Sequence, residues 1–498
     1  MTDGAPAGPA DWTPDVPVEP LDAPGHILDL VEPLRGLDIA VVDGDGSLTY
    51  DGLGERSAAI AAALRAAGTR PGDPVVVHTR LSRWAVAAML GVLRAGARYV
   101  PIDAAFPLAR RRYMATASGA RLAVTEPGLP ITLDGLQPIP ADMDGPPGSG
   151  AHSPDTLRGP LAYTCFTSGS TGTPKGVTVS AAALAASTAA RLTYYKDPVT
   201  AFLLCSSISF DSSVAGIYWT LACHGRIVIP SDRPADLAAI GRAARHHHAS
   251  HLLMLPSLYS IALDGGAERF ATLSAVIVAG EACPPELVRQ HFAALPGTQL
   301  YNEYGPTECT VWSTVHACSP EDANLSDVPI GRPVPGTLLY VRDTAGRPMS
   351  AGGTGELCIG GPGLAESVPG PYHTGDQVSV TADGELRFHG RTDHQLKLGG
   401  VRIERTEVEQ ALRAHRDVFA AAVGLGLAGG RKRLVGFVIP AGTTVDSRTV
   451  RAHLVERLPA VAVPSRIEIL SRFPSLPNGK LDRDALDRLA EAALAVKP

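Results

Sequence analysis

Aromatic side chains are scarce in this sequence, at 5% of 498 residues, and closely spaced cysteine pairs are missing. The seven cysteines lie far apart, and none has the CxxC spacing that is typical of a zinc or redox site. An odd number of widely spaced cysteines favours a reducing, cytoplasmic setting over a disulfide framework.

Long apolar runs are missing as well. No stretch of about 18 or more uninterrupted apolar residues occurs, so we expect no membrane span. The start of the chain, MTDGAPAGPADWTPDVPVEP, lacks the basic and apolar regions of a signal peptide. The sequence also has no excess of positive charge. Its formal net charge is -6 and its pI about 6.2, which argues against a nucleic-acid-binding protein.

What remains is an ordinary globular composition on a long chain, with 45% hydrophobic and 19% charged residues. A chain of 498 residues is too long for one hydrophobic core, so we expect at least two domains. Short apolar strands such as PVVVHT, RYVPID and SAVIVAG alternate with helical segments such as RWAVAAMLGVLRAG. This alternation predicts an α/β fold with layered and largely parallel sheets.

Three regions are expected along the chain. Residues 1–22 are rich in Pro, Ala and Asp and predict a disordered tail. Residues 23–392 predict a large core of layered α/β subdomains. Residues 393–498 predict a small α+β lobe, which begins with a strand, a glycine turn and a helix. In the first long helix of the core, Asp51 is the expected N-cap and Gly68 the expected stop.

The most informative segment reads YTCFTSGSTGTPKG and follows an apolar strand. Its six central positions are hydroxyl residues and glycines, namely Thr167, Ser168, Gly169, Ser170, Thr171 and Gly172. Glycine lets the backbone approach an anion closely, hydroxyl and N–H groups donate to phosphate oxygens, and Lys175 adds positive charge. The segment is not a GxxxxGK[ST] loop, because Thr-Pro separates Gly172 from Lys175. A flexible surface loop is the competing interpretation of this composition.

The string TSGSTGTPKG resembles the signature of the adenylate-forming superfamily, which includes acyl-CoA synthetases, luciferases and the adenylation domains of nonribosomal peptide synthetases. Further segments match that family in its order: LTYDGLGERSAAIAAALRAAG, LRAGARYVPID, NEYGPTECT, GELCIGG, YHTGD, GRTDHQLKLGGVRIE and PNGKLDR. The resemblance covers nearly the whole chain. It implies a large core that binds ATP and substrate, a mobile C-terminal lobe, and ATP-dependent activation of a carboxylate with Mg²⁺.

The resemblance also implies which residues surround the nucleotide. Besides the glycine-rich loop, they are Gly280, Glu281, Ala282, Asn302, Tyr304, Asp376 and Arg391. Tyr304 is expected to stack on adenine and Asn302 to read its edge, while Asp376 accepts from the ribose hydroxyls. Glu308 is the expected Mg²⁺ ligand, since Mg²⁺ takes few protein carboxylates and keeps phosphate oxygens in its shell.

The catalytic residues implied in the same way are Lys480, Thr307 and Lys175. Lys480 would stabilise charge on the α-phosphate and on the attacking carboxylate. Asp393 is the expected hinge about which the lobe rotates between half-reactions, after which the Gly399–Gly400 turn lines a thiol tunnel.

Asp211 occupies the position at which amino-acid-activating members carry a partner for the substrate ammonium. Motif alignment gives the remaining pocket positions as Ser212, Ala215, Met254, Ile277, Ala279, Glu303, Val311 and Trp312. Trp312 is expected to fill the pocket floor and leave room for a small side chain. Glu303 has two interpretations: it meets a second cation on the substrate, or it turns away toward solvent or an arginine.

Two departures from the family pattern stand out. The segment between Ala365 and Tyr372 is shorter than usual, and His373 replaces the usual basic residue. In addition, no carrier domain follows Pro498, so we expect a stand-alone enzyme that meets its carrier protein in trans. The string FDSSVAGIYWTL is also similar to enzymes that load starter amino acids, some of them β-amino acids, in macrolactam polyketide pathways.

Taken as a whole, the resemblance implies an amino acid:carrier-protein ligase of secondary metabolism, which activates a small α- or β-amino acid and transfers it to a phosphopantetheine thiol. An acyl- or aryl-CoA ligase, which would use free CoA and need no Asp211, is the first alternative. A nucleotide-binding protein without turnover is the second, and the presence of Lys175, Glu308 and Lys480 speaks against it.

Overall fold

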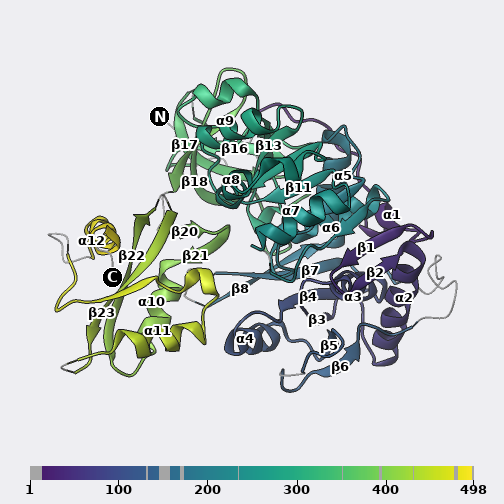
Figure 1. The fold of residues 1–498 in the computed structure, drawn as a ribbon, viewed down its shortest axis with the longest axis horizontal. Helices are drawn as coiled ribbons and strands as arrows, with labels where there is room; N and C mark the ends of the chain where they lie inside the picture. Colours follow the sequence, from purple (N-terminus) through teal and green to yellow (C-terminus); the bar gives the residue numbers. More distant parts are fainter. Residues whose placement is uncertain are drawn as a thin grey trace, which may run out of the picture. The chain divides into compact units, whose positions relative to one another are not determined.

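The structure is a computed structural model of the chain, and it describes residues 14–130, 133–144, 157–168, 173–233, 235–349, 352–391, 395–429, 431–442, 444–475 and 481–495. The chain forms two compact units. The first contains most of residues 1–392, and the second contains residues 393–498 together with two short segments, 105–114 and 166–175. Figure 1 shows the ribbon, coloured along the sequence.

The largest sheet of the first unit has nine strands. In spatial order they are β15 (Arg332–Pro333), β14 (Thr314–Ala317), β13 (Gln299–Tyr304), β12 (Ala275–Ala279), β11 (His251–Met254), β9 (Ala201–Leu203), β10 (Arg226–Val228), β1 (Ile39–Asp43) and β2 (Gly46–Thr49). The strands from β13 to β1 pair in parallel, and antiparallel partners close the sheet at each end. The carboxyl ends of β11, β12 and β13 therefore meet along one edge.

Two smaller sheets complete the first unit. One has six strands: β6 (Gln137–Pro140), β5 (Leu122–Thr125), β3 (Pro74–Thr79), β4 (Arg98–Asp103), β7 (Leu161–Thr167) and β8 (Lys175–Ser180). The other is antiparallel: β16 (Leu338–Arg342), β17 (Thr354–Gly360), β18 (Tyr372–Val380) and β19 (Leu386–Arg391). The α/β class with largely parallel sheets is thus confirmed.

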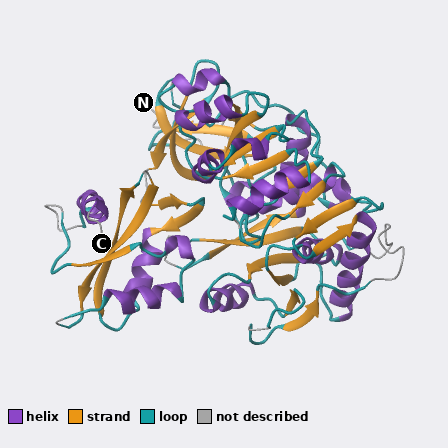
Figure 2. Cartoon of the chain, in the orientation of Figure 1, coloured by secondary structure: helices purple, strands orange, loops and turns teal. Residues whose placement is uncertain are grey.

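Helices cover the sheets, as Figure 2 shows in purple. The helices of the first unit are α1 (Leu28–Val31), α2 (Tyr50–Ala66), α3 (Arg83–Arg94), α5 (Ala181–Tyr194), α6 (Asp211–Ala222), α7 (Leu237–His246), α8 (Pro256–Asp264) and α9 (Pro285–Ala294), with the short turns η2 (Ala267–Phe270), η3 (Thr307–Cys309) and η4 (Pro320–Asn324). Helix α4 (Leu108–Ser118) begins in the second unit and ends in the first. Apolar residues of α2, α3, α5 and α6 share one core, and those of α7, α8 and α9 share another. None of the helices among the described residues is long and apolar enough to cross a bilayer.

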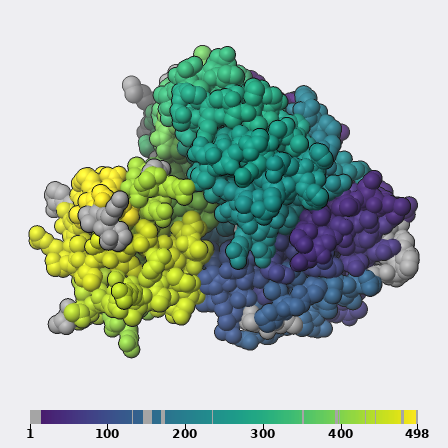
Figure 3. All heavy atoms as spheres, in the orientation of Figure 1, coloured from purple at the N-terminus to yellow at the C-terminus, as the bar shows by residue number. Residues whose placement is uncertain are grey.

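The second unit, whose residues from 395 onward are yellow-green to yellow in Figure 3, is the small α+β body that the sequence predicts. It has its own apolar core. Its elements are β20 (Gln395–Leu398), β21 (Val401–Glu404), α10 (Arg405–Arg413), β22 (Val418–Ala428), β23 (Arg431–Pro440), α11 (Ser447–Val455), η5 (Ala460–Ala462), β24 (Arg466–Ile469) and α12 (Arg483–Ala495). Gly399 and Gly400, with φ of 54° and 69°, form the two-residue turn between β20 and β21.

Two local expectations were wrong. Helix α2 is capped by Thr49, whose side chain accepts from the Gly52 N–H, and Asp51 lies inside the first turn. The predicted disordered tail also differs over its described part, residues 14–22. Val16 is buried beside the antiparallel sheet, and Asp15 accepts hydrogen bonds from the Val341 N–H and the Arg342 side chain. The burial of Val16 and the ion pair of Asp15 with the buried Arg342 outweigh the Pro-rich composition there.

Candidate active site

The glycine-rich loop begins at the end of β7, in the six-stranded sheet. Ser168 is buried and Thr167 half-buried, and Lys175 is exposed at the start of β8. The four residues between Ser168 and Thr173, which carry the central Gly-Ser-Thr-Gly of the predicted phosphate loop, lie outside the described residues. The strand that leads into the loop is therefore as predicted, and the phosphate contacts of the loop stay a prediction.

The residues expected around adenine and ribose are brought together. Tyr304, the last residue of β13, donates its hydroxyl to Asp376 in β18. Arg391 in β19 binds the other oxygen of Asp376 and also donates to the Thr374 carbonyl at 2.9 Å. Burial and the neighbouring Asp376 carboxylate raise the pKa of Tyr304 well above its ordinary value, so its hydroxyl stays protonated as a donor. Asp376, the predicted ribose acceptor, is thus held from both sides.

The expected adenine border lies at the carboxyl ends of the parallel strands, where open α/β sheets bind ligands. Gly280 follows β12 with a φ of 83°, a left-handed conformation that suits glycine. Glu281 accepts from the Ser257 N–H at 3.2 Å, and Ala282 is exposed. Asn302 in β13 is buried and donates to the Pro329 carbonyl at 2.8 Å.

Thr307 and Glu308 form the short turn η3 beside the start of α6. The Thr307 side chain hydrogen-bonds Asp211, the first residue of α6. Glu308 is buried, and its carbonyl accepts from the Ala365 N–H at 2.9 Å. The unusually short segment after Ala365 therefore ties directly to the residue expected to bind Mg²⁺. A buried carboxylate is a hard oxygen donor that fits this ion.

Asp211 carries an unusual charge balance. Burial raises the pKa of its carboxyl from 3.8 to about 6, and the nearby Glu308 charge acts in the same direction. Hydrogen bonds from Thr307 and from the first N–H groups of α6 oppose the increase. Burial outweighs these hydrogen bonds, so the site holds an anion that lacks full compensation. A cation placed against Asp211 would relieve that cost.

Glu303 pairs with a buried arginine, which is one of the two outcomes that the sequence left open. Two nitrogens of Arg191 in α5 lie 2.6 and 2.9 Å from its carboxylate oxygens. The Tyr195 hydroxyl donates to the same carboxylate at 2.5 Å. The side chains of Arg191 and Glu303 are only 1% and 2% exposed. The charge of Glu303 is therefore neutralised inside the protein.

Trp312 packs directly against this polar pair. The Arg191 guanidinium carbon lies 4.2 Å from the centroid of the Trp312 ring, within cation–π range. Tyr195 stacks on the same ring with centroids 5.8 Å apart, and the indole N–H donates to the Ser187 carbonyl at 3.2 Å. Trp312 is thus fixed by three neighbours, and its role as the pocket floor stays a prediction.

The loop that presents Trp312 is conformationally strained. Thr310 and Val311 have φ of 55° and 81°, values that side-chain-bearing residues rarely adopt. A Cβ at Gly305 would lie 2.4 Å from the Trp312 Cα, so the two arms of the loop meet only because residue 305 has no side chain. The Thr310 hydroxyl donates to the Gly363 carbonyl at 2.6 Å and helps to hold the strained backbone.

The other predicted pocket residues divide between two cores. Ala215 and Ile277 are buried in the same apolar cluster as Trp312, and Ser212 and Ala279 are half-buried at the ends of α6 and β12. Met254 packs instead with the helices α7 to α9. Side chains alternate along β11, so Met254 lies on the side of that second cluster, and its place in the pocket stays a prediction.

Sequence reasoning missed Arg191 and Tyr195. Both lie at the end of α5, outside every matched motif, and only the unexplained charge of Glu303 hinted at a buried cation. Lys480, the expected catalytic lysine, and Asp393, the expected hinge, lie outside the described residues. Their roles stay predictions.

Comparison with known proteins identifies the family of the chain. The AMP-binding enzyme family matches residues 35–367, and the AMP-binding enzyme C-terminal domain matches residues 407–480. The phosphinothricin tripeptide synthetase PhsC from Streptomyces viridochromogenes is 36% identical over 493 residues, which cover 91% of this chain and 44% of that protein. The chain spans less than half the length of the first curated relatives that it matches.

Solved structures share the fold. The amide bond synthetase McbA from Marinactinospora thermotolerans superposes with a TM-score of 0.84 at 23% identity, covering 93% of this chain and 99% of McbA. Holo-PA1221, a nonribosomal peptide synthetase protein with adenylation and PCP domains, has a TM-score of 0.80 at 24% identity, covering 95% of this chain and 84% of its own. Since the family match spans more than half of the sequence, the chain belongs to the AMP-binding family of adenylate-forming ligases and is related to the adenylation domains of nonribosomal peptide synthetases.

Proposed function

We propose that this enzyme activates the carboxylate of a small amino acid with ATP, releases pyrophosphate, and passes the aminoacyl group to the phosphopantetheine thiol of a carrier protein. The observation that carries the proposal is Asp211. It is a half-buried carboxylate whose pKa is raised to about 6 by desolvation and whose neighbours Thr307 and Glu308 belong to the expected Mg²⁺ and phosphate side. A substrate ammonium is the cation that would compensate it.

The wall behind Asp211 argues for an uncharged side chain on the substrate. The carboxylate of Glu303 is paired with Arg191, so it has no charge left for a second substrate cation. Trp312 lies over that pair and occupies the space that a bulky side chain would need. Together these residues favour a small, neutral amino acid, and both an α- and a β-ammonium are compatible with this charge pattern.

ATP and Mg²⁺ would bind on the side of Asp211 that faces Thr307 and Glu308. Tyr304, Asp376 and Arg391 form the hydrogen-bonded group expected to hold adenine and ribose, and Glu308 would hold Mg²⁺. The ion would offset the negative charge of the phosphates. Lys480, outside the described residues, would add positive charge between the α-phosphate and the attacking carboxylate.

The choice of acceptor is supported by the relatives. One of them is a tripeptide synthetase, and PA1221 combines adenylation and PCP domains, so both favour a carrier-protein thiol as acceptor. The likeness to the amide bond synthetase McbA keeps a second acceptor class, an amine, open to test. Free CoA is the third acceptor, and it belongs to the acyl-CoA ligase alternative.

The test measures pyrophosphate release with a panel of α-amino acids, β-amino acids and their deaminated analogues. The panel is run on wild type, on Asp211→Ala and on the matched control Asp197→Ala, because Asp197 is an aspartate outside the site. Wild type should prefer small neutral amino acids over deaminated acids by about a hundredfold or more, because an unpaired buried charge costs several kcal/mol. Asp211→Ala should lose that preference, and the control should keep it. Equal activation of the deaminated acids by wild type would refute the ammonium role.

Acceptor choice is measured separately. Adenylate formed in the first step is offered to a holo carrier protein, to free CoA and to a primary amine in parallel reactions. Faster thioester formation on the carrier supports the proposal. Equal or faster transfer to CoA or to the amine would replace the carrier with that acceptor while leaving the first half-reaction intact.

A further inference from the structure

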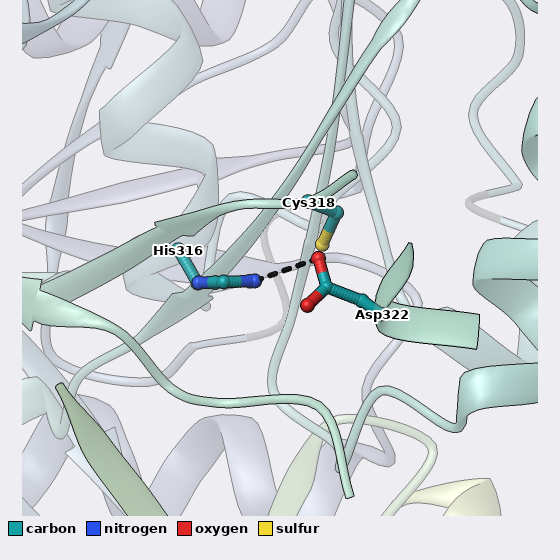
Figure 4. Close-up of side chains that lie close together, drawn as sticks. All are labelled: His316, Cys318 and Asp322. Atoms are coloured by element: carbon teal, nitrogen blue, oxygen red, sulfur yellow. Dashed lines mark hydrogen bonds and ion pairs between the residues drawn. The ribbon is translucent and has the colours of Figure 1, made fainter. Parts of the chain in front are cut away.

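A second group of chemically active side chains lies at the edge of the nine-stranded sheet, outside the proposed active site (Figure 4). It consists of His316 in β14, Cys318 just beyond that strand, and Asp322 in η4. One ligand atom from each residue lies within 4.8 Å of the others, and the His316 Nε2 is 3.0 Å from an Asp322 oxygen. All three residues are buried.

A second thiol lies next to this group. Cys283, in the segment before α9, is buried, and its thiol interacts with that of Cys318. Helix α9 packs against η4, so the segments that carry Cys283 and Asp322 are held together by their own elements. One thiol, one imidazole and one carboxylate thus converge in a buried position with a second thiol next to them, and this donor set is one that zinc binds.

The surrounding contacts orient these donors as in known metal sites. The His316 Nδ1 lies 3.1 Å from an oxygen of Glu385. As an outer partner, this carboxylate accepts the Nδ1 proton and leaves Nε2 to face the group as the metal-binding nitrogen. Asp322 is held by the Ser319 N–H at 2.7 Å through the capping box of η4. His316 and Cys318 are two positions apart on one extended segment, so their side chains point to the same face.

We propose that His316, Cys318 and Asp322 bind a structural zinc ion, that the neighbouring Cys283 completes its shell as the fourth ligand, and that Glu385 is the outer partner of the histidine. The bound ion replaces the protons of the two thiols, so its two positive charges face two thiolates and the Asp322 carboxylate. Four protein ligands fill a tetrahedral shell and leave no position for substrate, which makes the site structural rather than catalytic.

The proposed site is coupled to the nucleotide side through the sheet. His316 is the register partner of Asn302, and Thr314 is the partner of Tyr304, so β14 supports the strand that carries the expected adenine contacts. The ion joins β14, η4 and the segment before α9. Its loss should therefore loosen the strand that positions Tyr304, even though the ion touches no reacting group.

The experiment measures metal directly. The full chain is purified, incubated with Zn²⁺, dialysed against metal-free buffer and analysed by mass spectrometry of the elements. About one zinc per chain is expected to remain bound, since four buried protein ligands make a closed site. Cys318→Ser and Asp322→Asn should lose it. Glu385→Gln should keep the site but bind about 10- to 100-fold more weakly, as the loss of an outer partner typically does.

Cys358→Ser is the matched control. Cys358 belongs to a second group among the described residues, with Glu356 and His373, and this group is open to solvent because the His373 side chain is 53% exposed. That variant should retain the metal. Cobalt-loaded wild type gives a readout that does not depend on how any variant folds: thiolate-to-cobalt charge-transfer bands and the intense visible bands of a tetrahedral centre. The proposal is overturned if wild type keeps no metal, if retention depends on Cys358, or if the cobalt spectrum lacks thiolate bands.

Discussion

Replacing Glu303 by Gln tests the charge balance of the pocket wall with almost no change in shape. The variant removes the anion that faces Arg191 and leaves a guanidinium that is 1% exposed. Two charges whose centres are about 4 Å apart attract by about 4 kcal/mol at an effective dielectric constant of about 20. Breaking a buried pair by removing one partner costs about 3–5 kcal/mol, because the remaining charge has no solvent to replace it. We expect a loss of folding free energy in that range.

A double-mutant cycle separates this charge effect from packing. Arg191→Met should be about as costly as Glu303→Gln, because it leaves Glu303 as the unpaired buried charge. The double variant Arg191→Met/Glu303→Gln removes both charges and should lose much less free energy than the two single losses combined. Tyr195→Phe is the control: it removes one hydrogen bond to the same carboxylate without removing a charge, and should cost about 1.5–3 kcal/mol.

The assay is urea unfolding followed by circular dichroism, and the midpoints of the four variants are compared with wild type. If the losses of the two single variants simply add in the double variant, Arg191 and Glu303 are not energetically coupled, and the charge pairing described for the pocket wall is wrong. The same Glu303→Gln protein should also begin to activate amino acids with acidic side chains, since an unpaired Arg191 would then lie behind the pocket.

Three further predictions concern activity. Trp312→Ala should admit larger side chains in the pyrophosphate-release panel without losing the need for an ammonium, because it removes volume and leaves Asp211 unchanged; an unaltered size limit would show that Trp312 is not the floor. For wild type, kcat/KM for the amino acid should fall about tenfold per pH unit below about pH 6, because the raised pKa of Asp211 makes its ionised form scarce there. A pH profile of kcat/KM that stays flat well below that pKa would contradict this prediction. Lys480→Ala should lower adenylate formation by orders of magnitude while calorimetry shows little change in ATP binding, and a wild-type rate of adenylate formation would mean that the lysine is misassigned.

The sequence predicted those features that local patterns determine. Apolar runs became the strands β3, β4, β7 and β12 at the expected places, and the motif residues Tyr304 and Asp376 came together although 72 positions separate them. The resemblance to the family already implied that both residues surround the nucleotide. The expected helix stop at Gly68 is also observed: the helix ends at Ala66, and Gly68 adopts a φ of 83°.

What sequence reasoning missed depends on contacts between segments that no motif links. The pair of Arg191 and Glu303 joins α5 to β13 across 112 positions, and no local pattern marks the arginine. Nor could the sequence show which face of the sheet Met254 occupies, because one position along a strand exchanges the two faces. The cysteine spacing argued against a zinc site, whereas the proposed ligands come from separate segments that only the fold brings together.

The contact between Gly305 and Trp312 also limits how this enzyme could change its substrate over time. Substitutions at Trp312 alter the size of the floor, but any side chain at position 305 would collide with the backbone of the opposite arm. Mutation can therefore change what the loop carries much more readily than where the loop lies. New specificities reached by point mutation should reuse the same backbone with a different side chain at position 312, and a wider spacing of the two arms would require an insertion or deletion rather than a substitution.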